Sequence, residues 1–221
     1  MKKVVVFGGD GVGMSIASIV ELDDDAVMMG FINDNAQAGE MIGQFKKYPV
    51  LGDTSIVKEL LADDEVFFTF AYTAMKHAEH LYKKIQQINI PKDRLYSAIH
   101  PKAIIPEGFC KIGRGVVLYA NAQVGPDAIM DDYSMLFANT YLGHNSYLGP
   151  CAHLAAGSTV GAHVKIGKFT HIGLNALVKE HVTVGDYALI GAGAVVLKDV
   201  SDRSIVIGNP ARVLRQIEEQ D

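Results

Sequence analysis

One aliphatic residue recurs at every sixth position over a long stretch of this chain. The period is neither the 3.6 residues of a helix nor the two of an ordinary strand, so it indicates an internal repeat. A small or branched side chain stands two residues before most of these positions, and glycine follows many of them. The aliphatic residues are Ile112, Leu118, Val124, Met130, Leu136, Leu142, Leu148, Leu154, Val160, Ile166, Ile172, Val178, Val184, Ile190 and Val196.

This repeat predicts a parallel β-helix with three short strands per coil. Three six-residue units make an eighteen-residue coil, so the stretch spans about five coils. We expect the large aliphatic side chains to point to the axis, the small ones to fill the corners, and the glycines to allow turns at positive φ. Burial of each aliphatic contributes roughly 1.5–3 kcal/mol, which a stack of coils can gain and a single coil cannot.

The first part of the chain lacks the six-residue period and is typical of a small α/β domain. Residues 1–96 form this predicted domain, residues 97–200 the β-helix, and residues 201–221 a tail. The expected elements of the first domain are a strand over 3–7, a helix over 14–22, strands over 27–32 and 65–72, and a helix over 76–89. Residues 213–219 of the tail have the pattern of a short amphipathic helix.

A glycine-rich turn, Gly8-Gly9-Asp10-Gly11-Val12-Gly13, joins the first strand to the first helix. Backbone N–H groups and the helix dipole make such a turn a site for a phosphate-sized anion, and Asp34, after the second strand, could reach a ribose hydroxyl. The glycine spacing departs from the dinucleotide fingerprint, and the domain leaves no room for a second mononucleotide half. We therefore favour a nucleotide diphosphate-sugar over NAD; a tight turn without a ligand is the alternative.

Composition narrows the class of protein. A formal charge of -5 argues against a nucleic-acid partner, and 49% hydrophobic with 20% charged residues is typical of a globular protein. No apolar run approaches about 18 residues, and we expect no signal peptide before Val4. Cys110 falls at a small inward position and Cys151 at an outward one, so we expect two structural thiols in a reducing cytoplasm.

Five histidines lie within the repeat, none at an inward aliphatic position. Eighteen-residue stacking places His153 under His171 and His163 under His181, whereas His144 has Ala162 above it and no histidine partner. Three interpretations compete. The histidines are solvated or corner-packing side chains without a chemical role, or they form a zinc site like that of the γ-class carbonic anhydrases, or one of them is a general base. The His-x4-His spacing of that zinc family is absent, so no metal is expected.

The whole chain resembles the bacterial two-domain acyltransferases typified by the UDP-4-amino-sugar (bacillosamine pathway) N-acetyltransferases and the sialic acid O-acetyltransferases. The shared features are the glycine-rich turn, Ile99-His100-Pro101 at the junction, His144 followed nine residues later by His153, and the terminating segment Gly208-Asn209-Pro210-Ala211-Arg212. Parallel crossovers are normally right-handed. The resemblance instead implies a left-handed β-helix after a Rossmann-like domain.

The resemblance also implies roles for particular residues of the β-helix. His144 matches the catalytic histidine, and an imidazole titrating near about 6.5 suits a general base. Asn145 stands where the family usually has Asp or Glu, and it can hydrogen-bond to the ring without supplying a charge. His153 matches the histidine that approaches the acetyl group of acetyl-CoA, and Gly173 is a candidate oxyanion donor. The positions that line the pantetheine arm are Gly173, Leu174, Gly191 and Ala192.

In the first domain the resemblance aligns three residues, Asn33, Asp34 and Tyr72, with strand ends that contact the nucleotide. Together with the turn, the predicted nucleotide-sugar-binding residues are Gly9, Asp10, Gly11, Val12, Gly13, Asn33, Asp34 and Tyr72. Val12 stands where the family often has histidine, which leaves the details of nucleotide binding open.

These observations predict a cytoplasmic homotrimer that uses acetyl-CoA to acetylate the 4-amino group of a dTDP- or UDP-linked 4-amino-4,6-dideoxyhexose for O-antigen, other surface polysaccharide or glycan assembly. Trimerisation is implied by the resemblance, because flat-faced prisms pack around a threefold axis and build sites between chains. One alternative is O-acetylation of sialic acid or another sugar. A non-catalytic β-helix that assembles through its faces is an alternative of another class.

Overall fold

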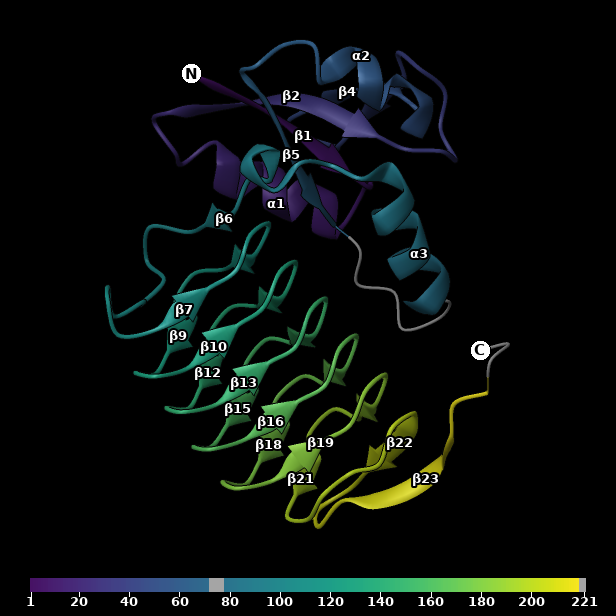
Figure 1. The fold of residues 1–221 in the computed structure, drawn as a ribbon. Coiled ribbons are helices and arrows are strands. Elements are labelled where there is room, and N and C mark those ends of the chain that lie inside the picture. The colour runs from purple at the N-terminus through teal and green to yellow at the C-terminus, as the bar shows by residue number, and fades with distance from the viewer. Residues whose placement is uncertain (72–77, 219–221) are drawn as a thin grey trace. The chain divides into compact units, whose positions relative to one another are not determined.

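The computed structural model describes residues 1–71 and 78–218 (Figure 1). Contacts divide the chain into two compact units, with the division between Ala98 and Ile99. Within the described ranges, no helix is both long and apolar enough to cross a membrane.

The first unit is built on a five-stranded sheet of order β3-β4-β2-β1-β5. Strand β1 pairs in parallel with β2 and β5, and β2 pairs in parallel with β4; only β3 runs antiparallel to its neighbour. Its elements are β1 (Lys2–Phe7), α1 (Val12–Val20), β2 (Ala26–Ile32), β3 (Met41–Ile42), β4 (Tyr48–Gly52), η1 (Thr54–Ile56), α2 (Val57–Leu60), β5 (Val66–Phe70), α3 (Ala78–Ile88) and η2 (Lys92–Arg94).

The buried run that predicted the first strand is β1, which lies between β2 and β5. Val4, Val5 and Val6 are fully buried, and the ring of Phe7 stacks on that of Phe70 at 4.4 Å. All three predicted strands and both helices are present, although residue 72 of the third strand and residues 76–77 of the second helix lie outside the described part. Strand β4 was missed because Pro49 weakens the local strand signal; its place between β3 and β2 depends on pairing with β2, which is not local in sequence.

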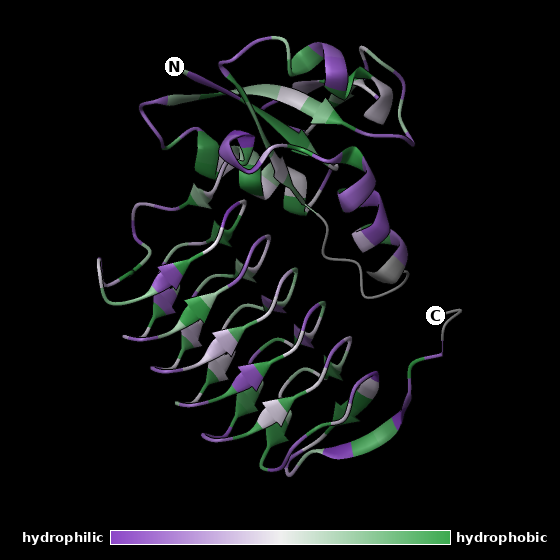
Figure 2. Cartoon of the chain, viewed as in Figure 1, coloured by the Kyte–Doolittle hydropathy of each residue, from purple (hydrophilic) through white to green (hydrophobic). Residues whose placement is uncertain are grey.

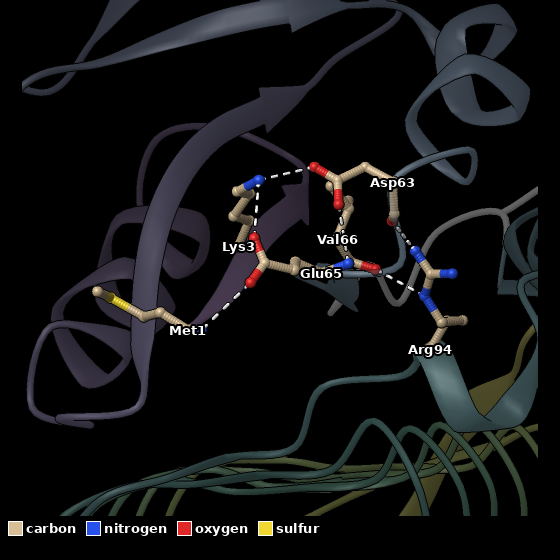
Figure 3. A network of polar contacts seen from close by, with 6 residues as sticks. All are labelled: Met1, Lys3, Asp63, Glu65, Val66 and Arg94. Carbon is tan, nitrogen blue, oxygen red and sulfur yellow. Dashed lines mark hydrogen bonds and ion pairs between the residues drawn. The ribbon is translucent and has the colours of Figure 1, made fainter.

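Charged side chains fasten the start of this sheet to the segment before β5 (Figure 3). The ammonium of Lys3 lies 2.7 Å from Asp63 and 3.0 Å from Glu65, and Nε of Arg94 donates to the carbonyl of Val66 at 2.8 Å. The carboxylates are substantially exposed, so solvent screening leaves each pair only a small contribution to stability. They help to hold β1 in register with β5.

The second unit is a parallel β-helix made from strands of two residues. We call its three sheets one (β6, β8, β11, β14, β17, β20, β22, β23), two (β9, β12, β15, β18, β21) and three (β7, β10, β13, β16, β19). The strands are β6 (Ala98–Ile99), β7 (Lys111–Ile112), β8 (Val117–Leu118), β9 (Gln123–Val124), β10 (Ile129–Met130), β11 (Met135–Leu136), β12 (Tyr141–Leu142), β13 (Tyr147–Leu148), β14 (His153–Leu154), β15 (Thr159–Val160), β16 (Lys165–Ile166), β17 (His171–Ile172), β18 (Leu177–Val178), β19 (Thr183–Val184), β20 (Leu189–Ile190), β21 (Val195–Val196), β22 (Ser204–Ile207) and β23 (Arg212–Gln216).

The predicted inward positions form the core of this unit. Every repeat aliphatic from Leu118 to Val196 is at most 4% exposed, and the small residues at the corners, such as Ala128 and Ser158, are fully buried. Strands eighteen residues apart pair in register, as Leu148 does with Ile166. Figure 2 shows hydrophobic residues recurring in each coil. The predicted parallel β-helix with eighteen residues per coil is therefore confirmed.

The prediction that the repeat glycines allow positive φ is wrong. Positive φ falls two residues after them, at turn positions held mostly by Asn, His and aromatic residues, such as Asn145 at 56°. The glycines are needed for close packing of coils instead: a Cβ on Gly125 would lie 2.5 Å from the amide nitrogen of His144. The sequence pattern was correct, but the physical reason for it is the spacing between coils.

The predicted helix over 213–219 is also wrong in its described part. Strand β22 continues sheet one in parallel with β20, and β23 then folds back to pair antiparallel with β22. Strand β22 would otherwise present open N–H and C=O groups at the sheet edge, and pairing with the tail satisfies them. This long-range pairing overrides a weak local helical pattern.

Both cysteines are free. Cys151, expected to face outward, is buried at a corner, and burial raises the pKa of its thiol to about 12. Cys110 is half-buried and packs against the core, and burial raises its pKa too. Neither thiol has the lowered pKa of a reactive cysteine.

Candidate active site

His144 lies at the corner where the chain passes from sheet two to sheet three. It follows strand β12 and precedes β13, and its side chain is exposed. Ser146, the small buried residue of this turn, donates to the carbonyl of Gly161 at 2.9 Å and accepts the N–H of Val164 at 3.0 Å. The turn that carries His144 is thereby tied to the next coil.

Asn145 orients the ring of His144. The Nδ1 atom of His144 lies 2.8 Å from Oδ1 of Asn145. Because an amide oxygen only accepts, Nδ1 carries the hydrogen in this arrangement, and in the neutral ring the lone pair is on Nε2. Asn145 is suited to the turn because asparagine tolerates the left-handed conformation found there. The pair predicted from sequence is present and leaves a proton acceptor exposed.

His144 also has an imidazole neighbour, contrary to the prediction that it has none. Its ring centroid lies 5.3 Å from that of His163, with the planes at 84°, and His163 stacks on His181 at 4.8 Å. Counting eighteen residues places Ala162 above His144, but the methyl group of alanine leaves room for the next residue along the turn. The three histidines form a ladder on one corner.

His153 and His171 form a separate pair on the outer side of sheet one, as the eighteen-residue spacing predicted. They face each other from paired strands with ring centroids 4.5 Å apart. His153 is only 6% exposed. Burial lowers its pKa to about 3, with His171 lowering it further and a hydrogen bond to the backbone of Cys151 opposing the shift. His153 is therefore neutral near pH 7 and can donate or accept a hydrogen bond rather than act as a base.

Apart from His153, the residues predicted to bind acetyl-CoA gather at the corner between sheets one and two. Gly173 and Leu174 follow β17, and Gly191 and Ala192 follow β20 in the next coil. Leu174 and Ala192 are exposed, whereas Gly173 is buried and a Cβ on it would lie 2.5 Å from the carbonyl oxygen of Ile190. The four residues therefore lie along the same corner, on two successive coils.

The prediction that Gly173 is an oxyanion donor is contradicted, because its N–H already donates to the carbonyl of Ile190 at 2.8 Å. Gly191 makes the equivalent bond to Val206. Within residues 1–71 and 78–218, no acceptor pairs with the N–H of Leu174 or of Ala192. These two N–H groups are among the donors that the corner offers to a ligand.

The predicted nucleotide turn lies at the carboxyl edge of the first unit's sheet. A Cβ on Gly9 would lie 3.0 Å from the side-chain nitrogen of Asn33, so these two residues are neighbours. Helix α1 begins at Val12, and its N-cap residue, Gly11, has no side chain that could accept a hydrogen bond from the first turn. The first backbone hydrogen bond of the helix runs from the N–H of Ser15 to the carbonyl of Gly11. The N–H groups of the first turn are therefore available to an anion. Asp10 is exposed at the turn, and Gly13 packs behind it on the ring of Phe31.

Asp34 lines a pocket of about 440 Å³ together with residues of helix α3. Its carboxylate pairs with the ammonium of Lys84 and accepts the N–H of Thr54 at 2.8 Å. Burial acts to raise the pKa of Asp34, but the hydrogen bonds from Lys84 and Thr54 outweigh it and lower the pKa. The pocket is lined by Asp34, Thr54, His80, Lys84, Gln87 and Ile88. Tyr72 lies outside the described residues.

Sequence reasoning missed the helix α3 side of this pocket. His80, Lys84 and Gln87 recur at the spacing of one helix face, which was a detectable signal. A row of polar residues on one face of a helix usually faces solvent. The contact between Lys84 and Asp34 is what indicates that this row lines a pocket.

The candidate residues of the β-helix do not come together within one chain. In a triangular coil, the corner between sheets two and three lies opposite sheet one. His144 and His153 therefore face different sides of the same protomer. No group of three or more His, Cys, Asp or Glu side chains in the described ranges is arranged to hold a metal ion.

No protein-family model matches this sequence, and no curated protein matches it. Solved structures do match over the full chain. The acetyltransferase domain of PglB from Neisseria gonorrhoeae superposes with a TM-score of 0.82 at 25% identity, covering 97% of this chain and 100% of that one. The chain has the fold of that domain.

Two further structures support the same fold. Perosamine N-acetyltransferase from Caulobacter crescentus, in complex with CoA and GDP-perosamine, gives a TM-score of 0.84 at 23% identity and covers 98% of both chains. WeeI from Acinetobacter baumannii gives 0.80 at 21% identity, covering 97% of this chain and 100% of that one. The resemblance to nucleotide-sugar N-acetyltransferases is confirmed, and the three parallel sheets of short strands fit the left-handed β-helix that it implies.

Proposed function

We propose that this protein is an acetyl-CoA-dependent N-acetyltransferase acting on the 4-amino group of a nucleotide-linked 4-amino-4,6-dideoxyhexose. The observation that carries the proposal is the full-length similarity to the PglB acetyltransferase domain, which has been solved in complex with acetyl coenzyme A at 26% identity to this chain. The exposed His144 with its oriented ring supplies the base that the reaction needs.

The chemistry follows from the His144–Asn145 pair. The sugar amine attacks the thioester carbonyl, a C–N bond forms, and the C–S bond then breaks to release CoA. Nε2 of His144 accepts the proton that the amine loses and can return it to the departing thiolate. Asn145 holds Nδ1–H so that Nε2 faces outward. As a neutral amide it stabilises the imidazolium less than a carboxylate would.

The corner between sheets one and two is the proposed acetyl-CoA site. The free N–H groups of Leu174 and Ala192 are available to the amide carbonyls of the pantetheine arm. We assign the role first considered for Gly173 to the N–H of Leu174, the adjacent donor. His153, neutral and fixed on sheet one, would hydrogen-bond near the acetyl group.

The active site would be complete only between two chains. The proposed acetyl-CoA corner, between sheets one and two, and the His144 corner, between sheets two and three, are separated by the width of sheet two, so we propose that a second copy supplies one of them. We propose a homotrimer, in which a threefold axis repeats this arrangement and gives equivalent sites at each interface.

The first unit is the proposed nucleotide-sugar-binding domain, Rossmann-like and extending over residues 1–96, with the β-helix over 97–200 and the tail after it. The N-terminus of α1 and the turn from Gly9 to Gly13 would bind the diphosphate, and Asn33 and the pocket beside Asp34 would hold the nucleoside. Tyr72 remains a proposed contact. We propose dTDP or UDP as the nucleotide; GDP is to be tested with them because the Caulobacter crescentus enzyme was solved with GDP-perosamine.

A thiol-release assay tests the activity. The protein is incubated with acetyl-CoA and, in turn, dTDP-, UDP- and GDP-linked 4-amino sugars, and the product is analysed by mass spectrometry for an acetamide. We expect turnover with at least one nucleotide amino sugar and none with its 4-hydroxyl counterpart. Turnover on free sialic acid would instead support O-acetylation, and no turnover on any sugar would support a non-catalytic assembly role. The product would enter O-antigen, other surface polysaccharide or glycan synthesis in the cytoplasm.

A further inference from the structure

We propose that His163 is a positioning residue that holds the ring of His144 in its productive orientation. The inference rests on the proposed function, since it assigns a role relative to the proposed base. Its observation is the edge-to-face contact of the two imidazoles, with ring centroids 5.3 Å apart and planes at 84°. Edge-to-face contact is one of the two favoured arrangements of a pair of aromatic rings.

The backbone places His163 for this contact. It lies eighteen residues after Asn145, one coil further along the same corner, and its N–H donates to the carbonyl of His144 at 3.0 Å. Its φ of 56° is left-handed, as at the equivalent position of the other turns. The ring of His144 is therefore restrained twice, at Nδ1 by Asn145 and over the ring by His163.

A second restraint matters because the first is weak. The acceptor in the hydrogen bond from His144 is the uncharged amide of Asn145, and such a bond is about half as strong as one to a carboxylate. The side chain of His144 is also exposed, so packing inside its own coil does not fix it. His163 supplies the packing surface that the corner otherwise lacks. His181 stacks on His163 but belongs to the following coil, two coils beyond that of His144.

The turn positions supply well-matched variants. His163→Asn removes the ring and retains a residue that other turns place at the same φ, such as Asn175 at 53°. His163→Phe retains an aromatic ring, and Phe169 at 52° demonstrates that phenylalanine is compatible with this turn conformation. His181→Asn is the matched control, because it removes an exposed imidazole from the same corner one coil further on, at φ 61°.

The test measures kcat and KM of the full-length protein for both substrates. We expect His163→Asn to lower kcat about tenfold with both KM values within about twofold, and His163→Phe to restore most of the activity. His181→Asn should resemble the wild type. Unchanged kcat in His163→Asn, an equal loss in His181→Asn, or a loss confined to KM would overturn the proposal.

A readout that does not need catalysis separates this inference from the proposed function. The rate at which diethyl pyrocarbonate modifies His144, followed by mass spectrometry of the peptide, reports whether another ring covers it. We expect a severalfold faster rate in His163→Asn and a near wild-type rate in His163→Phe. Equal rates in all variants would overturn the positioning role. A wild-type protein without transferase activity would instead contradict the proposed function while leaving this measurement interpretable.

Discussion

Nδ1 of His144 lies 2.8 Å from the side-chain oxygen of Asn145, the next residue in the chain. This contact leads to a prediction for two variants. Asn145→Gly removes the amide while keeping a residue suited to positive φ, and we expect kcat to fall about tenfold, the effect of one hydrogen bond of about 1.4 kcal/mol. Asn145→Asp should retain or raise kcat, because a carboxylate stabilises the imidazolium. Steady-state kinetics of both variants would decide, and wild-type kcat in Asn145→Gly would contradict the orienting role.

The packing of coils predicts an asymmetry between glycines. Gly173→Ala places a methyl group against the carbonyl of Ile190, so we expect a loss of about 1–3 kcal/mol of stability. Gly193→Asn should change stability by less than about 0.5 kcal/mol, because the position has open space and φ of 66°, and Asn175 holds the same place one coil earlier. Chemical denaturation of both variants measures the difference. Equal stabilities would mean that close coil spacing is not why glycine is needed at position 173.

The pocket beside Asp34 predicts a selective effect on the nucleotide sugar. Lys84→Gln removes the partner of the Asp34 carboxylate and a wall of the pocket. We expect KM for the nucleotide sugar to rise about fivefold, as for the loss of roughly 1 kcal/mol, with KM for acetyl-CoA unchanged. Lys83→Gln, on the exposed neighbouring position of α3, is the control. If both lysine variants behave alike, the pocket does not hold the nucleoside.

The buried His153 predicts how stability depends on pH. Its pKa falls from 6.5 to about 3 on folding. Between these two pH values the unfolded chain binds a proton at His153 and the folded chain does not. Stability is therefore full above about pH 6.5 and declines as the pH falls toward 3, by up to about 1.4 kcal/mol per pH unit.

Replacement of His153 by leucine should reduce that slope. Leucine fits the position, because Leu189 occupies the equivalent place two coils further along sheet one. His171, whose pKa burial also lowers, keeps part of it. Urea denaturation at a series of pH values between about 4 and 7 measures the slope of the wild type and of the variant. An unaltered slope in the variant would show that His153 is not the group responsible.

The regular part of the fold was predictable because its signal is local and repeated. Each aliphatic from Leu118 to Val196 reports the same environment, so the period fixes the coil length and the inward face. The His144–Asn145 pair was predictable for a similar reason, since neighbours in sequence share one turn.

Other features depend on contacts that sequence spacing does not encode. The role of the glycines follows from the distance between coils, and the tail strand β23 from the open edge of β22. Likewise, Lys84 became a candidate only through its pairing with Asp34, fifty residues away. The contact between His144 and His163 was missed because counting by eighteen gives Ala162 as the residue above His144 and ignores the side chain one position further along the turn.

Subunit complementation tests the central claim most directly, namely that His144 acts on acetyl-CoA held by another chain. His144→Ala removes the base, and Ala192→Glu blocks the exposed corner proposed to bind acetyl-CoA. Each variant alone should be inactive. When the two are co-expressed in equal amounts with different tags, about a quarter of the sites in a random trimer would combine an intact His144 with a neighbour's intact corner. We predict recovery of about that fraction of wild-type activity, whereas mixed oligomers without activity would contradict a site shared between chains.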